Sequence, residues 1–376
     1  MTEKAAGLPR IVLVLTVGAA LVIVMAGTRA ASGLLGNVFL ALVLTITVHP
    51  VRAWLRRRGL PGWLVSIIML LAVYLILVVI VLMLVVSIAR LAALLPGYAP
   101  QVQDNLDAVG GWLHDLGVKQ EQVNAVIDSF NWGNLVGLAT DILSSALGIA
   151  SDIFFIATLL LFMAFDTTKT TEALEHMHAQ RPDFVDGLRA FATGTRNYMA
   201  VSAGFGAIVA VIDAVLLEIM GVPGAFIWGV LAFVTNFIPN IGFVIGVIPP
   251  ALIGLLEGGP GLMIGVIVMY AVVNFVIQSV IQPRIAGDRV GLSATVTFLS
   301  LVFWSFLLGP LGALLAVPCT LLARGLLIDA DPSARWTLPL ISGKPNLTPE
   351  QIEAAYAGPE RAAVTSSEEE GRSAGA

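Results

Sequence analysis

Long apolar runs, separated by short polar segments, dominate the pattern of this chain. A run of about 20 apolar residues is long enough, as a helix, to cross the hydrocarbon core of a bilayer. Unbroken runs of this kind predict membrane-spanning helices at residues 11–26, 34–48, 63–89, 143–165, 198–220 and 262–282. The pattern is therefore that of a membrane protein that crosses the bilayer several times.

Two further apolar runs, residues 222–256 and 290–327, are interrupted in their middle. The first is broken by the segment from Asn236 to Gly242, which contains Pro239, and the second by Gly309-Pro310-Leu311-Gly312. Proline lacks a backbone donor and clashes with the preceding turn, so neither run continues as one regular helix. Broken backbone at membrane depth is tolerated only where it is buried in protein or lines a cavity, and paired interruptions point to a transporter's binding site.

Positive charge predicts which side each segment faces. The segment from His49 to Gly59 holds four arginines and no acid, so the positive-inside rule places it in the cytoplasm. The resulting topology puts 17 of the 20 Lys and Arg residues inside, with both termini cytoplasmic. Each broken run then begins and ends on one side, the first outside and the second inside. We expect two re-entrant hairpins entering from opposite faces, with pairs of short spans as the alternative.

The predicted fold class is an all-α membrane protein. It has about six full transmembrane helices, two inverted re-entrant helical hairpins and a small extracytoplasmic helical insertion. The expected divisions are residues 1–89 (helices 1–3), 90–142 (the acidic extracytoplasmic insertion), 143–197 (helix 4 and a cytoplasmic loop), 198–328 (a transport core with broken hairpins at 222–256 and 290–327) and 329–376 (a partly disordered cytoplasmic tail).

Composition supports a membrane protein and excludes several other classes. Of 376 residues, 57% are hydrophobic and 12% charged, against about 25% charged in soluble domains. The net charge of −5 argues against nucleic acid as a partner, and the single Cys319 rules out a disulfide framework or a thiolate metal site. Phosphate-binding loops, nucleophile elbows and H-E-x-x-H motifs are missing from the sequence. We therefore expect no enzyme activity, catalytic residue, cofactor or metal.

Polar residues inside the apolar runs are the candidates for function. Asp213 and Asp152 are candidates for ion coupling because a charge within a span is costly, although each is also compatible with a water-exposed helix end. Asn274, Gln278 and Gln282 recur every four residues and so share one helix face. Interhelical packing through amide hydrogen bonds is the alternative. The predicted solute-binding set is Asn236, Pro239, Asn240, Gly242, Asn274, Gln278, Gln282, Pro283, Thr295, Gly309, Pro310 and Gly312.

Four short motifs resemble the autoinducer-2 exporter family of bacterial membrane proteins. They are FIPNIG at 237–242, VIPP at 247–250, QPRIAG at 282–287 followed by VGLS at 290–293, and LGPLGALLAVP at 308–318. The resemblance implies an inner-membrane transporter, secondary-active or facilitative, whose relatives carry the quorum-sensing signal or exchange sodium for protons. It also implies a homo-oligomer, with a pentamer as the suggested number, and a transport unit that moves against an oligomeric scaffold. Relatives often place an acid where this chain has Gln278 and Gln282, which weakens carboxylate coupling there.

Three functions remain open at this point. The favoured prediction is export of a small polar solute or an autoinducer-2-like signal by alternating access. A sodium or lithium/proton antiporter is the second, and a non-transporting scaffold whose external insertion binds a partner is the third. The expected partners are the lipid bilayer, a small polar solute and further copies of the chain in the bacterial inner membrane.

Overall fold

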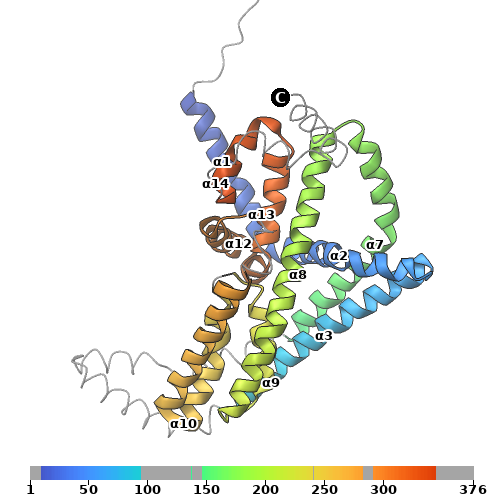
Figure 1. The fold of residues 1–376 in the computed structure, drawn as a ribbon. Coiled ribbons are helices and arrows are strands. Elements are labelled where there is room, and N and C mark those ends of the chain that lie inside the picture. The colour runs from blue at the N-terminus through green and yellow to red at the C-terminus, as the bar shows by residue number, and fades with distance from the viewer. Residues whose placement is uncertain (1–9, 95–136, 138–145, 240, 283–290, 344–376) are drawn as a thin grey trace, which may run out of the picture.

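The computed structural model describes residues 10–94, 137, 146–239, 241–282 and 291–343, and every regular element in these ranges is a helix. Figure 1 shows α8, Pro182–Ile219, running through the whole height of the molecule with the other helices around it. Most of the predicted insertion at 90–142 and the tail beyond residue 343 lie outside the described residues.

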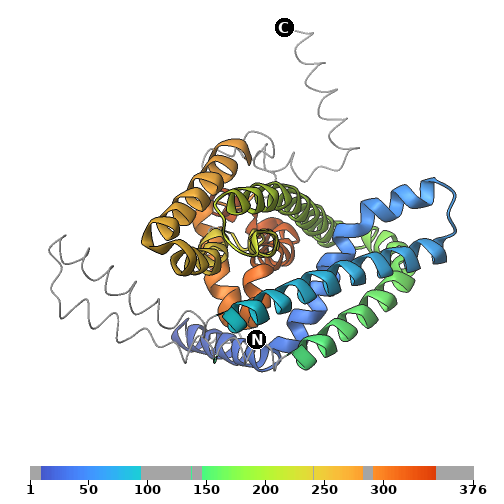
Figure 2. The same ribbon diagram turned by 90° about the horizontal axis from the view of Figure 1, so that it is seen from below.

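The N-terminal half contributes four helices to the described part of the chain. The helices are α1 (Arg10–Ala30), α2 (Ser32–Arg57), α3 (Gly62–Leu94) and α7 (Ala146–His178). We call α2, α3 and α7 the lateral bundle, because they pack together and extend sideways from α8 (Figures 1 and 2). Its core is the buried cluster of Ala41, Val73, Ile156 and Leu160.

The first interrupted run folds into a helical hairpin against α8. Its first arm is α9, Ala225–Thr235, and its second arm begins α10, Gly242–Asn274, which continues as η2, Phe275–Ile281. A side chain on Gly242 would collide with the carbonyl of Thr235, so the two arms touch where the chain turns. A second bend follows inside α10 at Gly259, whose φ of 69° is in the left-handed region that favours glycine.

The second interrupted run folds back in the same way at Gly309, where φ is 66°. Its arms come from α12 (Ala294–Leu314) and α13 (Ala316–Arg324), which leads into η3 (Gly325–Asp329). The indole N–H of Trp304 donates to Thr320 Oγ1 at 2.9 Å. In a straight helix these residues would lie about 24 Å apart, so this run is a closed hairpin.

The two hairpins meet at an apolar contact. Phe237, in the turn of the first hairpin, packs against a buried cluster that includes Leu307, Leu308 and Leu315 of the second. The bend of the second hairpin also lies against α2, where Leu311 would touch a side chain on Gly36. Hydrophobic packing therefore joins both bends to each other and to the lateral bundle.

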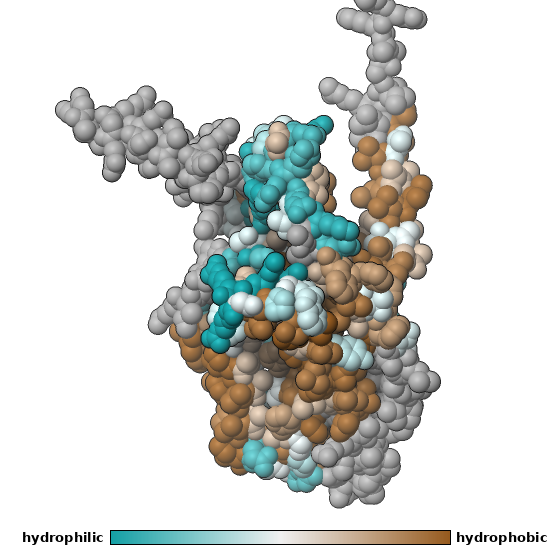
Figure 3. All heavy atoms as spheres, turned by 90° about the vertical axis from the view of Figure 1, so that its right-hand side faces the viewer, coloured by the Kyte–Doolittle hydropathy of each residue, from teal (hydrophilic) through white to brown (hydrophobic). Residues whose placement is uncertain are grey.

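Several helices are long and apolar enough to cross a membrane. By length and composition there are five among the described residues, or up to six if a bent pair within α7 counts as one span; two of the five, Gly242–Ile281 and Ala294–Leu314, contain the bends at Gly259 and Gly309. Hydrophobic side chains form a broad band over the lower part of the face in Figure 3, with hydrophilic residues gathered above it. The multi-helix membrane architecture expected from the sequence is thus confirmed.

Residues 166–197, predicted to form the cytoplasmic loop after helix 4, are helical apart from the turn at Ala179–Arg181. α7 and α8 both continue beyond their apolar parts, and their polar ends face each other. Asp186 lies 3.3 Å from His178 Nε2 and 3.5 Å from Arg189 Nη1. Charged side chains at helical spacing let a solvated helix persist where low hydrophobicity alone suggested a loop.

The C-terminal part of the described chain caps one end of the second hairpin. It comprises η4 (Pro332–Thr337) and α14 (Leu338–Ser342). The backbone N–H of Ser293, just before α12, donates to the carbonyl of Ile341 at 2.8 Å. The segment after the hairpin therefore returns to the place where the hairpin begins.

Candidate functional site

A fully buried carboxylate lies on the face of α8 that packs against the first hairpin. Asp213 has no exposed surface, and neither of its carboxylate oxygens has a hydrogen-bond partner among the described residues. An ionised carboxylate held in this way is strongly disfavoured unless a proton or a cation accompanies it. Asp213 is therefore a buried acid whose carboxylate no described residue bonds.

The side chains around Asp213 line a small, closed polar pocket, whose interior is too narrow to hold a water molecule. Tyr270 of α10 lies within electrostatic range of the carboxylate, and its buried hydroxyl also has no partner among the described residues. The lining combines residues of α8, both arms of the first hairpin and the second half of α10: Val209, Asp213, Ala232, Thr235, Asn236, Phe243, Gly246, Tyr270 and Asn274. The pocket thus lies where three structural units meet.

Three amides form a hydrogen-bonded chain at the edge of this pocket. Gln278 Nε2 donates to Asn274 Oδ1 at 3.0 Å and to Asn236 Oδ1 at 3.4 Å. Asn274 Nδ2 donates in turn to the carbonyl of Tyr270 at 2.9 Å. The chain connects the turn of the first hairpin to the helix face predicted from the four-residue spacing of the amides.

The turn of the first hairpin is anchored to α8 by two further bonds. The hydroxyl of Tyr198 donates to the carbonyl of Phe237 at 2.9 Å, and Asn236 Nδ2 donates to the carbonyl of Ser202 at 3.0 Å. A side chain on Gly206 would touch Asn236, so glycine permits this close approach of α8 to the turn. The carbonyl of Phe237, in the helix break, is thus held by a side chain of α8.

The structure brings together only part of the predicted set. Asp213, Asn236, Asn274 and Gln278 converge at the pocket, and Gly242 and Pro239 belong to the adjoining turn. Gln282 follows η2, one turn beyond Gln278. Asn240 and Pro283 lie outside the described residues.

Other predicted residues lie elsewhere in the fold. Asp152, on α7, accepts a hydrogen bond from Asn37 Nδ2 of α2 at 2.8 Å, inside the lateral bundle. Thr295 is exposed near the start of α12. Gly309, Pro310 and Gly312 form the bend of the second hairpin, which contributes none of the residues that line the pocket.

Sequence reasoning missed Tyr270 and Thr235. Tyr270 lies four residues before Asn274, so extending the polar stripe back by one turn would have found it. Thr235 directly precedes Asn236, but a hydroxyl in a helix commonly bonds its own backbone and gives no distinct signal. Its Oγ1 does donate to the carbonyl of Ala232, at 3.3 Å.

Comparison with known proteins decides the family. The model of the AI-2E family transporters matches residues 12–329, which is most of the chain. The chain belongs to the AI-2E transporter family. Relatives within this group include YhhT of Escherichia coli K12, 30% identical over 304 residues that cover 80% of this chain and 86% of that protein. AI-2 transport protein TqsA of the same organism is 29% identical over 306 residues, covering 81% of this chain and 88% of that protein.

Membership of the AI-2E family makes this chain a multi-pass membrane transporter, as the resemblance in its motifs implied. The match extends from α1 through η3 and therefore includes both hairpins and the polar pocket.

Proposed function

We propose that this AI-2E family member is a secondary or facilitative transporter that exports a small polar solute across the bacterial inner membrane by alternating access. The observation that carries the proposal is the buried polar pocket between α8, the first hairpin and α10. Burying a polar atom without a hydrogen-bond partner destabilises a protein. The presence of such atoms in this pocket therefore favours a role in binding.

The hairpins would re-enter the membrane from opposite faces as an inverted pair. α9 has 11 residues and is about 16 Å long, against a hydrocarbon core of about 30 Å. In both bends, a glycine lies against a backbone carbonyl of the opposite arm. Gly242 lies against the carbonyl of Thr235, and Gly312 lies against the carbonyl of Trp304. A side chain at either glycine would force the arms apart.

The amide chain would bind the solute. Asn and Gln offer both donors and acceptors, which suit a ligand rich in hydroxyl groups. The bond from Gln278 to Asn236 is long, at 3.4 Å, and it bridges two units that would separate when the pocket opens. Because the relative TqsA is named an AI-2 transport protein, autoinducer-2 is the first solute to test.

Asp213 would couple transport to an ion. Among the described residues packed around it, Tyr270 is the titratable group that faces the carboxylate, whereas Glu218 lies exposed further along α8. The same observation favours cation/proton exchange as a second candidate function. Asp152 is a weaker coupling candidate because its carboxylate already accepts a bond from Asn37.

The family resemblance extends the proposal to the assembly. We expect a homo-oligomer, a pentamer by that resemblance, with both termini cytoplasmic, the 90–142 insertion outside and hairpins that move against an oligomeric scaffold. The site needs no cofactor in this proposal.

The proposal is tested by efflux in a deletion strain that expresses single variants. Asn236→Ala and Gln278→Ala should lower the export rate of autoinducer-2 by about two- to tenfold, since each loses a hydrogen bond worth about 0.5–1.5 kcal/mol. Gln180→Ala, an equal change at an exposed turn, is the matched control. Unchanged intracellular levels of this signal and of other small polar metabolites in the deletion strain would count against export.

The second candidate has its own test. Addition of sodium to everted vesicles that hold an imposed pH gradient should dissipate the gradient only if the protein exchanges sodium for protons. Loss of this signal in Asp213→Asn would assign exchange to the pocket.

A further inference from the structure

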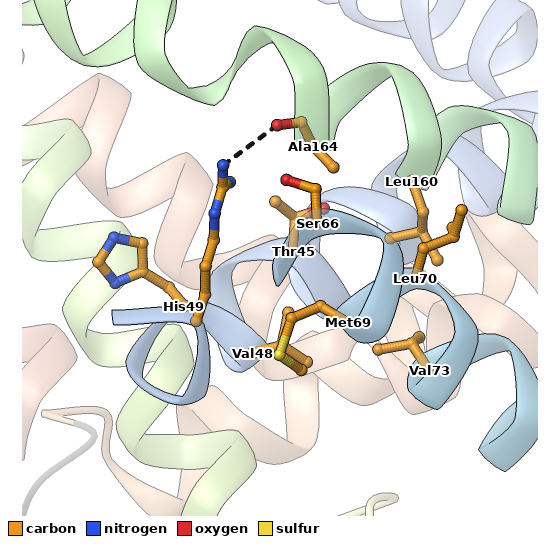
Figure 4. Close-up of a pocket in the computed structure, with 10 residues that line it drawn as sticks. Thr45, Val48, His49, Ser66, Met69, Leu70, Val73, Leu160 and Ala164 are labelled. Atoms are coloured by element: carbon orange, nitrogen blue, oxygen red, sulfur yellow. Dashed lines mark hydrogen bonds between the residues drawn. The ribbon is translucent and has the colours of Figure 1, made fainter. Parts of the chain in front are cut away.

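A second cavity lies in the lateral bundle, away from the polar pocket. It is a crevice between α2, α3 and α7 that has room of about 50 Å³ inside it and is open to its surroundings. Figure 4 shows its lining, which comes from all three helices.

The cavity is divided between a basic end and an aliphatic end. His49, Arg52 and Ser66 line the first, and Arg52 Nη2 donates to the carbonyl of Ala164 at 3.3 Å (Figure 4). The aliphatic lining consists of Val48, Met69, Leu70, Val73 and Leu160. A ligand that fills the cavity therefore combines a polar group at one end with a hydrocarbon part at the other.

Positive charge is concentrated around the basic end. His49 lies within electrostatic range of Arg52 and of Arg196 on α8, and Arg52 lies within range of Arg56. The Nε of Arg196 is buried and has no hydrogen-bond acceptor among the described residues. An anionic group placed here would be attracted by guanidinium groups from two helices.

Exposed tryptophans beside the basic end indicate that it lies at the depth of lipid head groups. Trp54 and Trp63, each half or more exposed, flank it on α2 and α3, two residues after Arg52 and three before Ser66. Exposed tryptophans mark the boundary between membrane and water. The guanidinium of Arg58 stacks on Trp54, with 3.9 Å between its Cζ and the ring centroid. This boundary carries the arginine-rich end of α2 and would be the cytoplasmic one.

We propose that this cavity binds an anionic phospholipid. Its phosphate lies beside Arg52 and His49, and an acyl chain follows Val48, Leu70 and Leu160 between the helices. Basic pockets between transmembrane helices on the cytoplasmic side suit phosphate head groups with one or more negative charges. Charge complementarity favours this occupant over a zwitterionic lipid, and the aliphatic lining favours it over a free anion.

The test uses the full-length protein, purified in detergent and delipidated. Phosphatidylglycerol should raise its melting temperature by about 2 °C or more and should remain bound in native mass spectra. Phosphatidylcholine and inorganic phosphate, at equal concentration, should each give less than half of that shift. An equal shift with phosphatidylcholine would overturn charge recognition, and an equal shift with phosphate would identify a free-anion site instead.

Single variants distinguish lipid binding in this cavity from lipid binding to exposed arginines nearby. Arg52→Gln should remove most of the phosphatidylglycerol shift, Arg52→Lys should keep at least half of it, and Leu70→Trp should remove it by filling the aliphatic end. Arg57→Gln is the matched control, because Arg57 is exposed on the same helix and does not line the cavity. A loss in Arg57→Gln equal to that in Arg52→Gln overturns the proposal.

Discussion

At the scale of single residues, the charge state of Asp213 is the variable that matters most. Its carboxylate has no exposure and no hydrogen-bond partner among the described residues, and it shares a pocket with the unpartnered hydroxyl of Tyr270. An ionised group there is unfavourable, so the closed pocket favours a neutral carboxyl or one paired with a cation. Opening the pocket to water would reverse that preference.

Replacing Asp213 by its neutral isostere should separate coupling from folding. Asp213→Asn removes the charge and keeps the shape, so the melting temperature should stay the same or rise. Export driven by an imposed pH gradient in proteoliposomes should fall by at least about tenfold if one proton or cation is coupled at this site. Glu218→Gln, a change at an exposed position on the same helix, is the control. Full gradient-driven export by Asp213→Asn would exclude Asp213 as the coupling group.

Functional residues could be predicted from the sequence where polar side chains recur at a regular spacing. The four-residue recurrence of Asn274 and Gln278 correctly predicted a shared face, and these residues are bonded to each other. Asp152 shows the limit of such reasoning. Its position within a span resembled that of Asp213, but Asn37 from another helix bonds it, and a partner 115 positions away cannot be recognised from local pattern.

At the scale of elements, each hairpin depends on one glycine beside its bend. Gly242→Ala and Gly312→Ala would each push a methyl group into a backbone carbonyl of the opposite arm, that of Thr235 or of Trp304. Overpacking of this kind costs about 1–3 kcal/mol, and backbone gives way less easily than a side chain. Both variants should melt at lower temperature in detergent. Gly261→Ala, in α10 with open space around it, should match the parent protein or melt slightly higher.

Helix ends illustrate why element boundaries were harder to predict than element positions. Hydrophobicity located the membrane parts of α7 and α8, but it carries no information on polar helix that continues into water. Asp186, placed between His178 and Arg189, supports those extensions through contacts across the turn and along α8. Proline and glycine, by contrast, marked both hairpin bends correctly because their backbone effects act within the same turn.

At the scale of the whole molecule, one ion pair joins the start of α8 to η4, and a second lies within the end of the second hairpin. Arg335 Nη2 lies 2.7 Å from Asp183, and Arg324 Nε lies 3.3 Å from Asp329. The side chain of Asp183 is 48% exposed, whereas that of Asp329 is 3% exposed. Breaking a buried pair costs about 3–5 kcal/mol, but an exposed pair contributes only about 0–1 kcal/mol.

Thermal unfolding of the purified protein should therefore show different melting temperatures for two matched aspartate variants. Asp329→Asn should lower the melting temperature clearly more than Asp183→Asn, although both remove one carboxylate from the same network. Double-mutant cycles with Arg324→Gln and Arg335→Gln should give a larger coupling energy for the buried pair. Equal destabilisation by the two aspartate variants would show that burial does not set their contributions.

The arrangement of the parts could not be predicted from the sequence. Apolar runs and their interruptions correctly predicted several spanning helices and two broken segments, because each signal is local. The contact of Leu311 with Gly36 joins the bend of the second hairpin to α2, and the lateral bundle extends away from α8. Both depend on packing between residues far apart in the chain. Such packing leaves no periodic pattern in a single sequence from which it could be predicted.

That contact offers a direct test of movement between the second hairpin and the lateral bundle. The Cβ of Leu311 would lie 3.4 Å from a Cβ built on Gly36, close to the separation found in disulfides. In a Cys319→Ser background, Gly36→Cys with Leu311→Cys should form a disulfide under oxidation. If alternating access requires the hairpin to leave α2, export should stop in the oxidised protein and recover on reduction. The single-cysteine variants, treated identically, should keep their activity. Full export by the crosslinked protein would mean that the hairpin stays on α2 throughout the cycle and that the moving part lies on the side of α9 and α10.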